Sequence, residues 1–331
     1  MAPPSSTKAY TDAWLAGYDG TQFYTRTYAA AAPRAVLLYV HGFSEHIARY
    51  EWAHSRCASE GITVFAFDQR GFGRTALDAA HRSKKSSYGR TNLHDQLSDI
   101  EWWLTHLHKE YPGLPLFTMG HSMGGALILA FATRTSPPPS QESIALLSGV
   151  IPSSTLLLQF VSTSRPVRVA AETLSLILPN LLFDASLPND YLSHDPAVKA
   201  ALEADPMIIQ KGSLRCLSDT LNNGERLYKH EYKNWPKNLP VLFMHGSGDR
   251  VTSFKAAQEF YENLPAEDKT FNTIEDGYHE LVHEPNGVKE KYMDDCIAWM
   301  LERSKRPTQP GSTSSPPAAQ EPAAETAPVV P

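Results

Sequence analysis

Six short runs of apolar, often branched residues are separated by longer amphipathic segments along most of this chain. They occupy residues 35–40, 62–67, 114–119, 144–147, 241–244 and 270–274, and each leads into a loop that carries Gly, Asp or His. Buried parallel strands have this continuous apolar character, and the segments between them suit covering helices. The pattern therefore predicts an α/β fold, with a mostly parallel sheet flanked by helices.

Composition narrows the class of protein. The chain has 331 residues, 42% of them hydrophobic, and a formal net charge of −6, so a broad basic face for nucleic acid is not expected. The three cysteines, Cys57, Cys216 and Cys296, are far apart and suggest neither a disulfide framework nor a thiolate metal site. No signal-peptide pattern and no run of eighteen apolar residues is found. We expect a cytoplasmic protein that is soluble or peripheral to a membrane.

The spacing of the runs predicts the domain organisation. Residues 1–150 and 237–305 form the two parts of one core, and residues 151–236 form an inserted cap subdomain, because this stretch is far longer than a crossover connection needs. The cap contains the apolar run 174–183, which either packs on the core or offers a face to substrate or membrane. Residues 306–331 are rich in Pro, Ala and Ser and are predicted to be a disordered tail.

The run at 114–119 leads into GHSMGG at residues 120–125, and a helix-like run, 126–131, follows. A strand, a G-x-S-x-G turn and a helix together are typical of a nucleophile elbow, which sets the Ser122 hydroxyl beside a helix N-terminus. Gly120 and Gly124 leave room near the serine backbone. The alternative is a glycine-rich turn with a capping serine.

A serine nucleophile requires a histidine base, and the histidine requires a carboxylate to fix its tautomer. Asp249 follows the run at 241–244, and His279 follows the run at 270–274, in the chain order Ser, acid, His that this elbow demands. The alternatives are an aspartate in an ordinary turn and a surface or capping histidine. The order and the positions after strands favour a triad of Ser122, Asp249 and His279.

An oxyanion also needs two backbone donors. The residue after the serine, Met123, is predicted to supply one, and Phe43, in the loop after the run at 35–40, the other. Gly42 permits close approach of the backbone there, although a plain turn is the alternative.

Residues 279–283 read HELVH and match H-E-x-x-H, in which two histidines on a helix bind zinc. Gly277 and Pro285 flank the match closely, so the middle of a long helix is not expected here. Asn286 and Lys289 also stand where an extended zinc motif has Gly and a third His. The sequence thus favours a metal-free site.

Residues 120–125, 41–46 (HGFSEH), 204–207 (ADPM) and 277–279 (GYH) together make the chain resemble the monoacylglycerol lipase family, most closely its fungal members. The resemblance covers about residues 10–305. It implies an α/β-hydrolase fold that hydrolyses monoacylglycerol to a free fatty acid and glycerol. It also implies an apolar cap that guides the acyl chain, no cofactor, and peripheral contact with a membrane such as a lipid droplet or the endoplasmic reticulum.

Carried over by position, the resemblance implies Ser122 as nucleophile, Asp249 and His279 as its partners, and Phe43 and Met123 as oxyanion donors.

Two further positions, Glu45 and Arg49, match the polar end of the family's site and are predicted either to place the glycerol or to form a structural ion pair. The chain departs from animal members at Leu202, where they carry a tyrosine three residues before the Asp205-Pro pair. Phe43 is also bulkier than the small residue often found at its position.

The same residues would serve a lysophospholipase, a general carboxylesterase or an acyltransferase. A lipid-binding protein on a hydrolase scaffold is a further alternative, which the filled triad positions disfavour.

Overall fold

The computed structural model describes residues 8–305, so the tail predicted for 306–331 lies outside the described residues. Its main sheet has eight strands in the order β1-β2-β4-β3-β5-β6-β9-β10. The strands are β1 (Thr11–Ala16), β2 (Gln22–Tyr28), β3 (Ala35–Val40), β4 (Ile62–Phe67), β5 (Leu116–His121), β6 (Leu147–Ser153), β9 (Val241–Gly246) and β10 (Lys269–Ile274). From β4 to β10 all neighbours are parallel, whereas β1 and β2 add an antiparallel edge.

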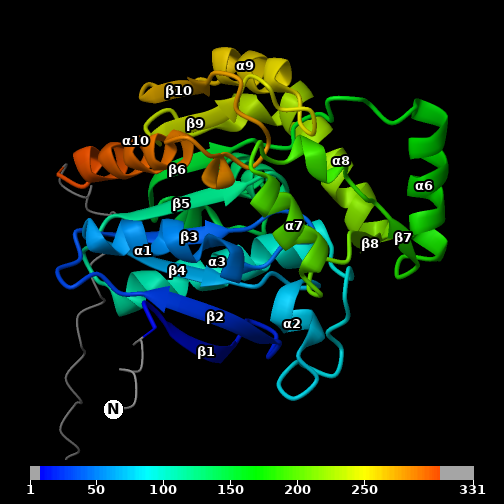
Figure 1. Cartoon of the computed structure of the whole chain (residues 1–331), viewed down its shortest axis with the longest axis horizontal. Coiled ribbons are helices and arrows are strands. Elements are labelled where there is room, and N and C mark those ends of the chain that lie inside the picture. Colours follow the sequence, from blue (N-terminus) through cyan, green and yellow to red (C-terminus); the bar gives the residue numbers. More distant parts are fainter. Residues whose placement is uncertain (1–7, 306–331) are drawn as a thin grey trace, which may run out of the picture.

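Helices cover both faces of this sheet (Figure 1). The α-helices are α1 (Glu51–Ser59), α2 (Gly73–Leu77), α3 (Leu93–Glu110), α4 (Met123–Thr133), α5 (Gln141–Ile144), α6 (Arg165–Ile177), α7 (Pro196–Ala204), α8 (Leu214–Lys229), α9 (Phe254–Asn263) and α10 (Val288–Arg303). Four 3-10 turns are η1 (Ile47–Tyr50), η2 (Asn189–Tyr191), η3 (Glu231–Asn234) and η4 (Leu281–His283).

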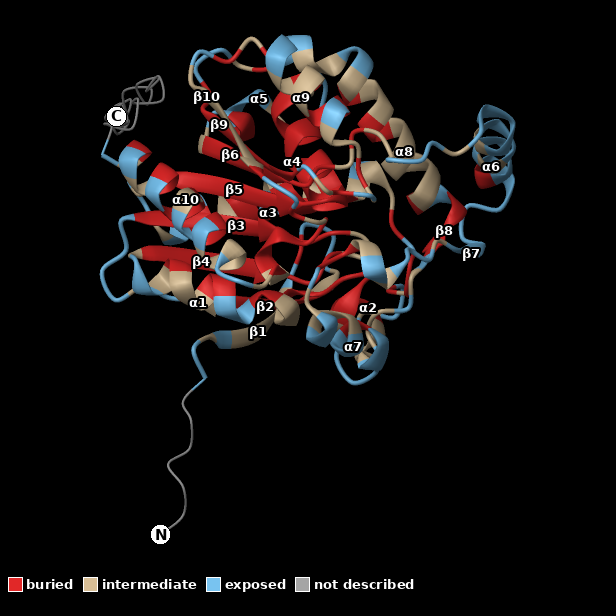
Figure 2. Cartoon of the chain, turned by 45° about the horizontal axis from the view of Figure 1, so that its top comes forward, coloured by how far each residue is buried: buried red, intermediate tan, exposed pale blue. Residues whose placement is uncertain are grey.

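The central position of β3 in the sheet explains why its sequence is apolar throughout. Val36, Leu38 and Val40 belong to a core that includes residues of α3, α4 and α9. Leu37 and Tyr39 belong to a second core, which includes residues of α1 and α10. Alternate side chains point to opposite faces of a strand, so a sheet covered on both faces needs apolar residues at every position. The buried centre between helices is visible in Figure 2.

The fold class and most strands agree with the prediction, but one predicted strand is wrong, and β1 and β2 are not among the predicted runs. The run at 144–147 is not a strand: α5 ends at Ile144, and β6 begins at Leu147. The Ser140 side chain caps α5 by accepting a hydrogen bond from the Ser143 amide. Strand β6 also contains Gly149, where a Cβ would lie 2.6 Å from the Trp299 ring, and such a glycine hides a strand from an apolar-run search.

Between β6 and β9 the chain leaves the main sheet. Strands β7 (Leu182–Asp184) and β8 (Lys211–Ser213) pair antiparallel there, and helix α6 stands away from the body of the molecule (Figures 1 and 2). The predicted division into a core at 1–150 and 237–305 and a cap at 151–236 stays a prediction.

The loops that carry the candidate residues all follow carboxyl ends of parallel strands. Residues 41–46 follow β3, Ser122 follows β5, Asp249 follows β9, and His279 follows β10. Parallel strands bring such loops to one edge of the sheet, which is where ligands bind in open α/β folds.

Candidate active site

Ser122 lies in a sharp turn between β5 and α4. Its backbone has φ 53° and ψ −115°, a positive φ that residues other than glycine rarely adopt. A Cβ at Gly120 would lie 2.5 Å from the Gly124 carbonyl oxygen, and one at Gly124 would lie 2.1 Å from that of Val40. The two glycines therefore let α4 approach β5 and β3 closely. A strained turn of this kind is characteristic of a functional position, here one that opens on a cavity.

Asp249 is held by a dense set of donors. Its Oδ1 accepts hydrogen bonds from the backbone amides of Val251 and Thr252, at 2.8 and 2.9 Å. Its Oδ2 lies 2.7 Å from the Thr252 hydroxyl, 2.9 Å from His279 Nδ1 and 3.2 Å from His245 Nε2. Burial by itself would raise the pKa of this carboxyl, but the two histidines outweigh burial and hold the pKa well below its ordinary value.

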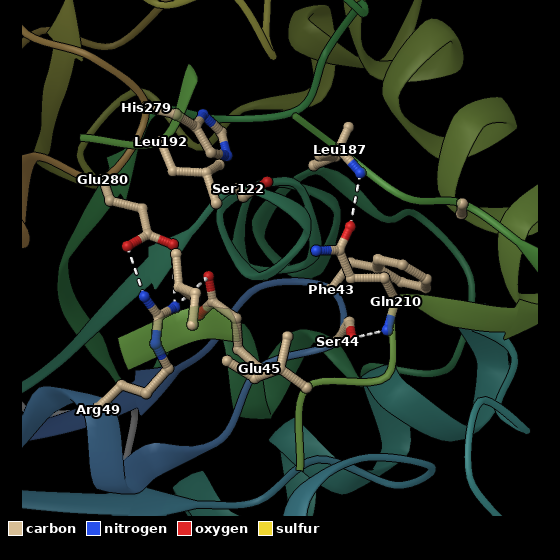
Figure 3. A pocket seen from close by; sticks show the side chains of 13 residues that line it. Phe43, Ser44, Glu45, Arg49, Ser122, Leu187, Leu192, Gln210, His279 and Glu280 are labelled. Carbon is tan, nitrogen blue, oxygen red and sulfur yellow. Dashed lines mark hydrogen bonds and ion pairs between the residues drawn. The ribbon is translucent and has the colours of Figure 1, made fainter. Parts of the chain in front are cut away.

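His279 is buried and oriented from two sides. Its Nδ1 faces Asp249, and its ring packs on the His121 ring with centroids 4.7 Å apart. Figure 3 shows a ring nitrogen of His279 directed toward the Ser122 hydroxyl, and both residues line the same cavity. The structure thus brings the three predicted residues to one place. The arrangement suits proton transfer from the serine to a histidine whose other nitrogen is held by a carboxylate.

The two predicted oxyanion donors lie on neighbouring segments. Phe43 follows β3, and Met123 is the first residue of α4, directly after Ser122. Within residues 8–305, neither amide donates a hydrogen bond to a protein acceptor. Both amides are therefore free to bind an oxyanion formed at Ser122.

Glu45 and Arg49 belong to a buried charged cluster at one end of the cavity. The Arg49 guanidinium donates to both carboxylate oxygens of Glu280, at 2.9 and 2.6 Å, and lies 3.3 Å from Glu45. Glu45 also accepts from the Gly42 amide at 3.2 Å and lies 3.2 Å from His121 Nδ1. The ion pair considered from the sequence is present, and both residues also line the cavity (Figure 3).

This cluster keeps its carboxylates ionised despite burial. Desolvation opposes the charged forms, yet the Arg49 charge and a hydrogen bond to His283 lower the pKa of Glu280 to about 2. His121 and Arg49 hold the pKa of Glu45 well below its ordinary value, and Glu45 raises the pKa of His121.

The cavity is partly open to solvent and is lined by both polar and apolar side chains. Its apolar walls come largely from residues between β6 and β9, namely Ala185, Leu187, Leu192, Leu202 and Ile208. Gln210 lines one side of the cavity and is held there by two hydrogen bonds (Figure 3). Its backbone amide donates to the Ser44 hydroxyl at 2.8 Å, and its side-chain oxygen accepts from the Leu187 backbone amide at 2.6 Å. The shape suits a molecule with a polar head and an apolar chain.

The H-E-x-x-H match does not form the geometry of a zinc helix. Residues 281–283 make only the 3-10 turn η4, and the two histidines face different partners. His279 faces Asp249, whereas His283 contacts Glu280 and the Arg49 carbonyl. Residues 8–305 contain no group of three or more His, Cys, Asp or Glu side chains that could hold a metal ion.

Sequence reasoning missed several residues of the site. Glu280 was noticed only inside the H-E-x-x-H match, although it is the principal partner of Arg49. His121 occupies the variable position of the G-x-S-x-G turn, and Leu192 and Gln210 belong to no motif. Only the position of Glu280, directly after His279, was a usable signal.

A family model described as Serine aminopeptidase, S33, matches residues 31–286 of the chain. A putative monoglyceride lipase from Schizosaccharomyces pombe is 33% identical over 275 residues, which cover 82% of this chain and 69% of the relative. The monoglyceride lipase of Saccharomyces cerevisiae is 29% identical, over 84% of this chain and 88% of the relative.

The chain is also similar to a solved monoglyceride lipase structure. A soluble variant of the Saccharomyces cerevisiae monoglyceride lipase, in complex with a substrate analogue, matches with a TM-score of 0.80 and 28% identity. The match covers 92% of this chain and all of that one. Similarity over nearly the whole length extends to the segment between β6 and β9 as well as the sheet.

Proposed function

The chain belongs to the monoacylglycerol lipase family, among the serine hydrolases matched by the S33 model, and from this premise we propose that it cleaves monoacylglycerol through Ser122. The observation that carries the proposal is the strained Ser122 turn beside the Asp249–His279 pair, all opening on one cavity. The products are a free fatty acid and glycerol.

In the proposed mechanism His279 takes the Ser122 proton while Ser122 Oγ attacks the ester carbonyl. The amides of Phe43 and Met123 bind the resulting oxyanion, and His279 then protonates the leaving glycerol oxygen. Water, deprotonated by the same histidine, hydrolyses the acyl-enzyme and releases the fatty acid. Asp249 keeps its charge throughout and stabilises the imidazolium.

The two ends of the cavity divide the substrate between them. The acyl chain lies along the leucine-rich walls, which exclude water, and the glycerol lies toward Glu45 and Arg49. Both groups already have protein partners: Arg49 donates to Glu280, and Glu45 accepts from the Gly42 amide and the Tyr50 hydroxyl. A glycerol hydroxyl placed here therefore shares these groups with their protein partners.

We also propose that the protein reaches its substrate by resting on a lipid surface through α6. On the side of this helix that faces α8, Arg168 contacts Glu225 and Asn222, and Glu172 accepts a hydrogen bond from Asn222. Apolar side chains such as Leu176 and Ile177 are 71% exposed. A helix that exposes several apolar side chains suits an apolar phase such as a lipid droplet or membrane surface.

A fluorophosphonate probe tests the nucleophile. The wild-type protein should be labelled and should hydrolyse monoacylglycerol, and Ser122→Ala should do neither. Ser44→Ala, which removes a second hydroxyl lining the cavity, should still be labelled at Ser122. Labelling of Ser122→Ala at the wild-type level would refute the proposal.

A substrate panel tests the substrate class. Monoacylglycerols of several chain lengths, lysophospholipids and short esters should be compared at the level of kcat/KM, with glycerol added as an acyl acceptor in parallel. We expect monoacylglycerols to be the best substrates. A clear preference for lysophospholipid or for acyl transfer would defeat the assignment.

A further inference from the structure

Two buried glutamines lie behind the oxyanion loop and have no place in the mechanism above. Gln69 follows β4 and Gln96 lies in the first turn of α3, with exposures of 2% and 4%. The Gln96 side-chain amide donates to Gln69 Oε1 at 3.1 Å. Burying two amide side chains costs free energy unless their polar atoms are hydrogen-bonded.

Gln69 holds His41 from two directions. Its backbone amide donates to His41 Nε2 at 2.8 Å, and its side-chain amide donates to the His41 carbonyl at 2.5 Å. Because His41 Nε2 accepts a hydrogen bond, the ring proton resides on Nδ1. Burial lowers the pKa of His41, which keeps the ring neutral in this tautomer.

The tautomer fixes a peptide group of the oxyanion loop. His41 Nδ1 donates to the Gly42 carbonyl oxygen at 2.8 Å. That carbonyl belongs to the same peptide group as the Phe43 amide, and in a trans peptide the C=O and N–H bonds point in opposite directions. Holding the Gly42 oxygen toward His41 therefore turns the Phe43 N–H away from His41 and leaves it free to donate to the proposed oxyanion.

The same cluster reaches the second donor. The Gln96 side-chain nitrogen also lies 3.9 Å from Met123 Sδ, on the residue whose backbone amide is the other proposed donor. Gln96 thus contacts Met123 directly and reaches Phe43 through Gln69 and His41.

We propose that Gln69 and Gln96 are positioning residues that hold the two halves of the oxyanion hole in register. The inference rests on the proposed function, since it concerns the donors to an oxyanion at Ser122. Its consequence is selective: loss of either side chain weakens binding of the tetrahedral state and leaves binding of the uncleaved substrate nearly unchanged.

The test compares Gln69→Leu, Gln96→Leu and the double variant with Ile100→Val. Ile100 is a buried residue one turn further along α3, so its variant controls for a packing defect in that helix. Two ligands are used: a trifluoromethyl ketone, whose carbonyl accepts Ser122 Oγ to form a tetrahedral oxyanion, and a non-cleavable ether analogue of monoacylglycerol, which forms none.

We expect each glutamine variant to lower kcat and the affinity for the ketone by about tenfold, a smaller loss than removal of an oxyanion donor causes. The affinity for the ether analogue should stay within about twofold of the wild-type value. The double variant should lose more than Gln69→Leu, because it also removes the Gln96 contact with Met123. Ile100→Val should leave the ratio of the two affinities unchanged. If Gln69→Leu does not fold, the test rests on Gln96→Leu. This variant keeps both hydrogen bonds between Gln69 and His41 and so disturbs the loop less.

Equal loss of both affinities, or the same change of ratio in Ile100→Val, would overturn the inference. The outcomes also separate it from the proposed function. A wild type that does not bind the ketone, or a Ser122→Ala variant that remains active, defeats the proposed function. Ketone binding by the wild type with an unchanged ratio in both glutamine variants defeats only the positioning role.

Discussion

The two oxygens of Asp249 are not equivalent, and the difference predicts the effect of an isosteric change. Oδ1 accepts from two backbone amides, which an Asn nitrogen cannot replace. In Asp249→Asn the amide nitrogen must therefore take the Oδ2 position and donate to His279 Nδ1. The ring proton then moves to Nε2, which can no longer accept the Ser122 proton. We expect kcat to fall by about 10³ to 10⁴-fold with little change in KM, measured by steady-state kinetics.

Thr252→Val is the matched control for this variant. It removes a hydrogen bond to the same Oδ2 atom but keeps the carboxylate and the His279 tautomer. Its loss of kcat should stay below about tenfold, the cost of one hydrogen bond. A comparable loss in both variants would mean that Asp249 acts through packing of its loop and not through the tautomer of His279.

At the scale of an element, substitutions in α6 should weaken lipid binding without changing catalysis at Ser122. Leu176→Glu with Ile177→Glu places two charges on its exposed apolar face, remote from Ser122 in sequence and outside the cavity lining. Each buried side chain of this size contributes about 1.5 to 3 kcal/mol, so vesicle binding should weaken more than about tenfold. Co-sedimentation with phospholipid vesicles measures the binding. Turnover of a water-soluble short ester should be unaffected.

Trp52→Glu controls for the added charge, since Trp52 is a 40% exposed apolar residue of α1 outside the segment between β6 and β9. This variant should sediment with vesicles as the wild type does. If the α6 variant also sediments normally, the lipid contact lies elsewhere on the molecule.

The strands also show which features of the fold could be predicted from the sequence. Buried parallel strands have continuous apolar sequences, so the predicted bounds of β3 and β4 agree with the structure at both ends. Strand β1 is mostly half-buried and mixes polar and apolar residues, and together with β2 it escaped prediction. The Ser122, Asp249 and His279 positions were visible because each lies a few residues beyond a strand.

The partners of the other site residues could not be predicted because they are distant in sequence. Arg49 and Glu280 are 231 residues apart, and they meet only because the loops after β3 and β10 lie on one edge of the sheet. The contacts of Gln69 with His41 likewise depend on the pairing of β4 with β3. No local pattern encodes such a pairing.

At the scale of the whole molecule, the Arg49–Glu280 ion pair joins the N-terminal and C-terminal parts of the sheet edge. Because the pKa of Glu280 falls from about 4.5 to about 2 on folding, the pair makes stability depend on pH. The stabilisation is fully present above the unfolded pKa and is lost as the pH falls through the folded pKa. A shift of this size corresponds to about 3 kcal/mol.

Glu280→Gln should therefore flatten the acid limb of the stability profile. Urea unfolding between pH 2 and 7 should show the variant less stable than the wild type above about pH 4.5, with the gap closing as the pH approaches 2. Glu142→Gln, at an exposed position in α5, should give a profile parallel to that of the wild type. A gap that stays constant from pH 7 to pH 2 would mean that the variant loses packing or a neutral hydrogen bond, and that the charge of Glu280 does not stabilise the fold.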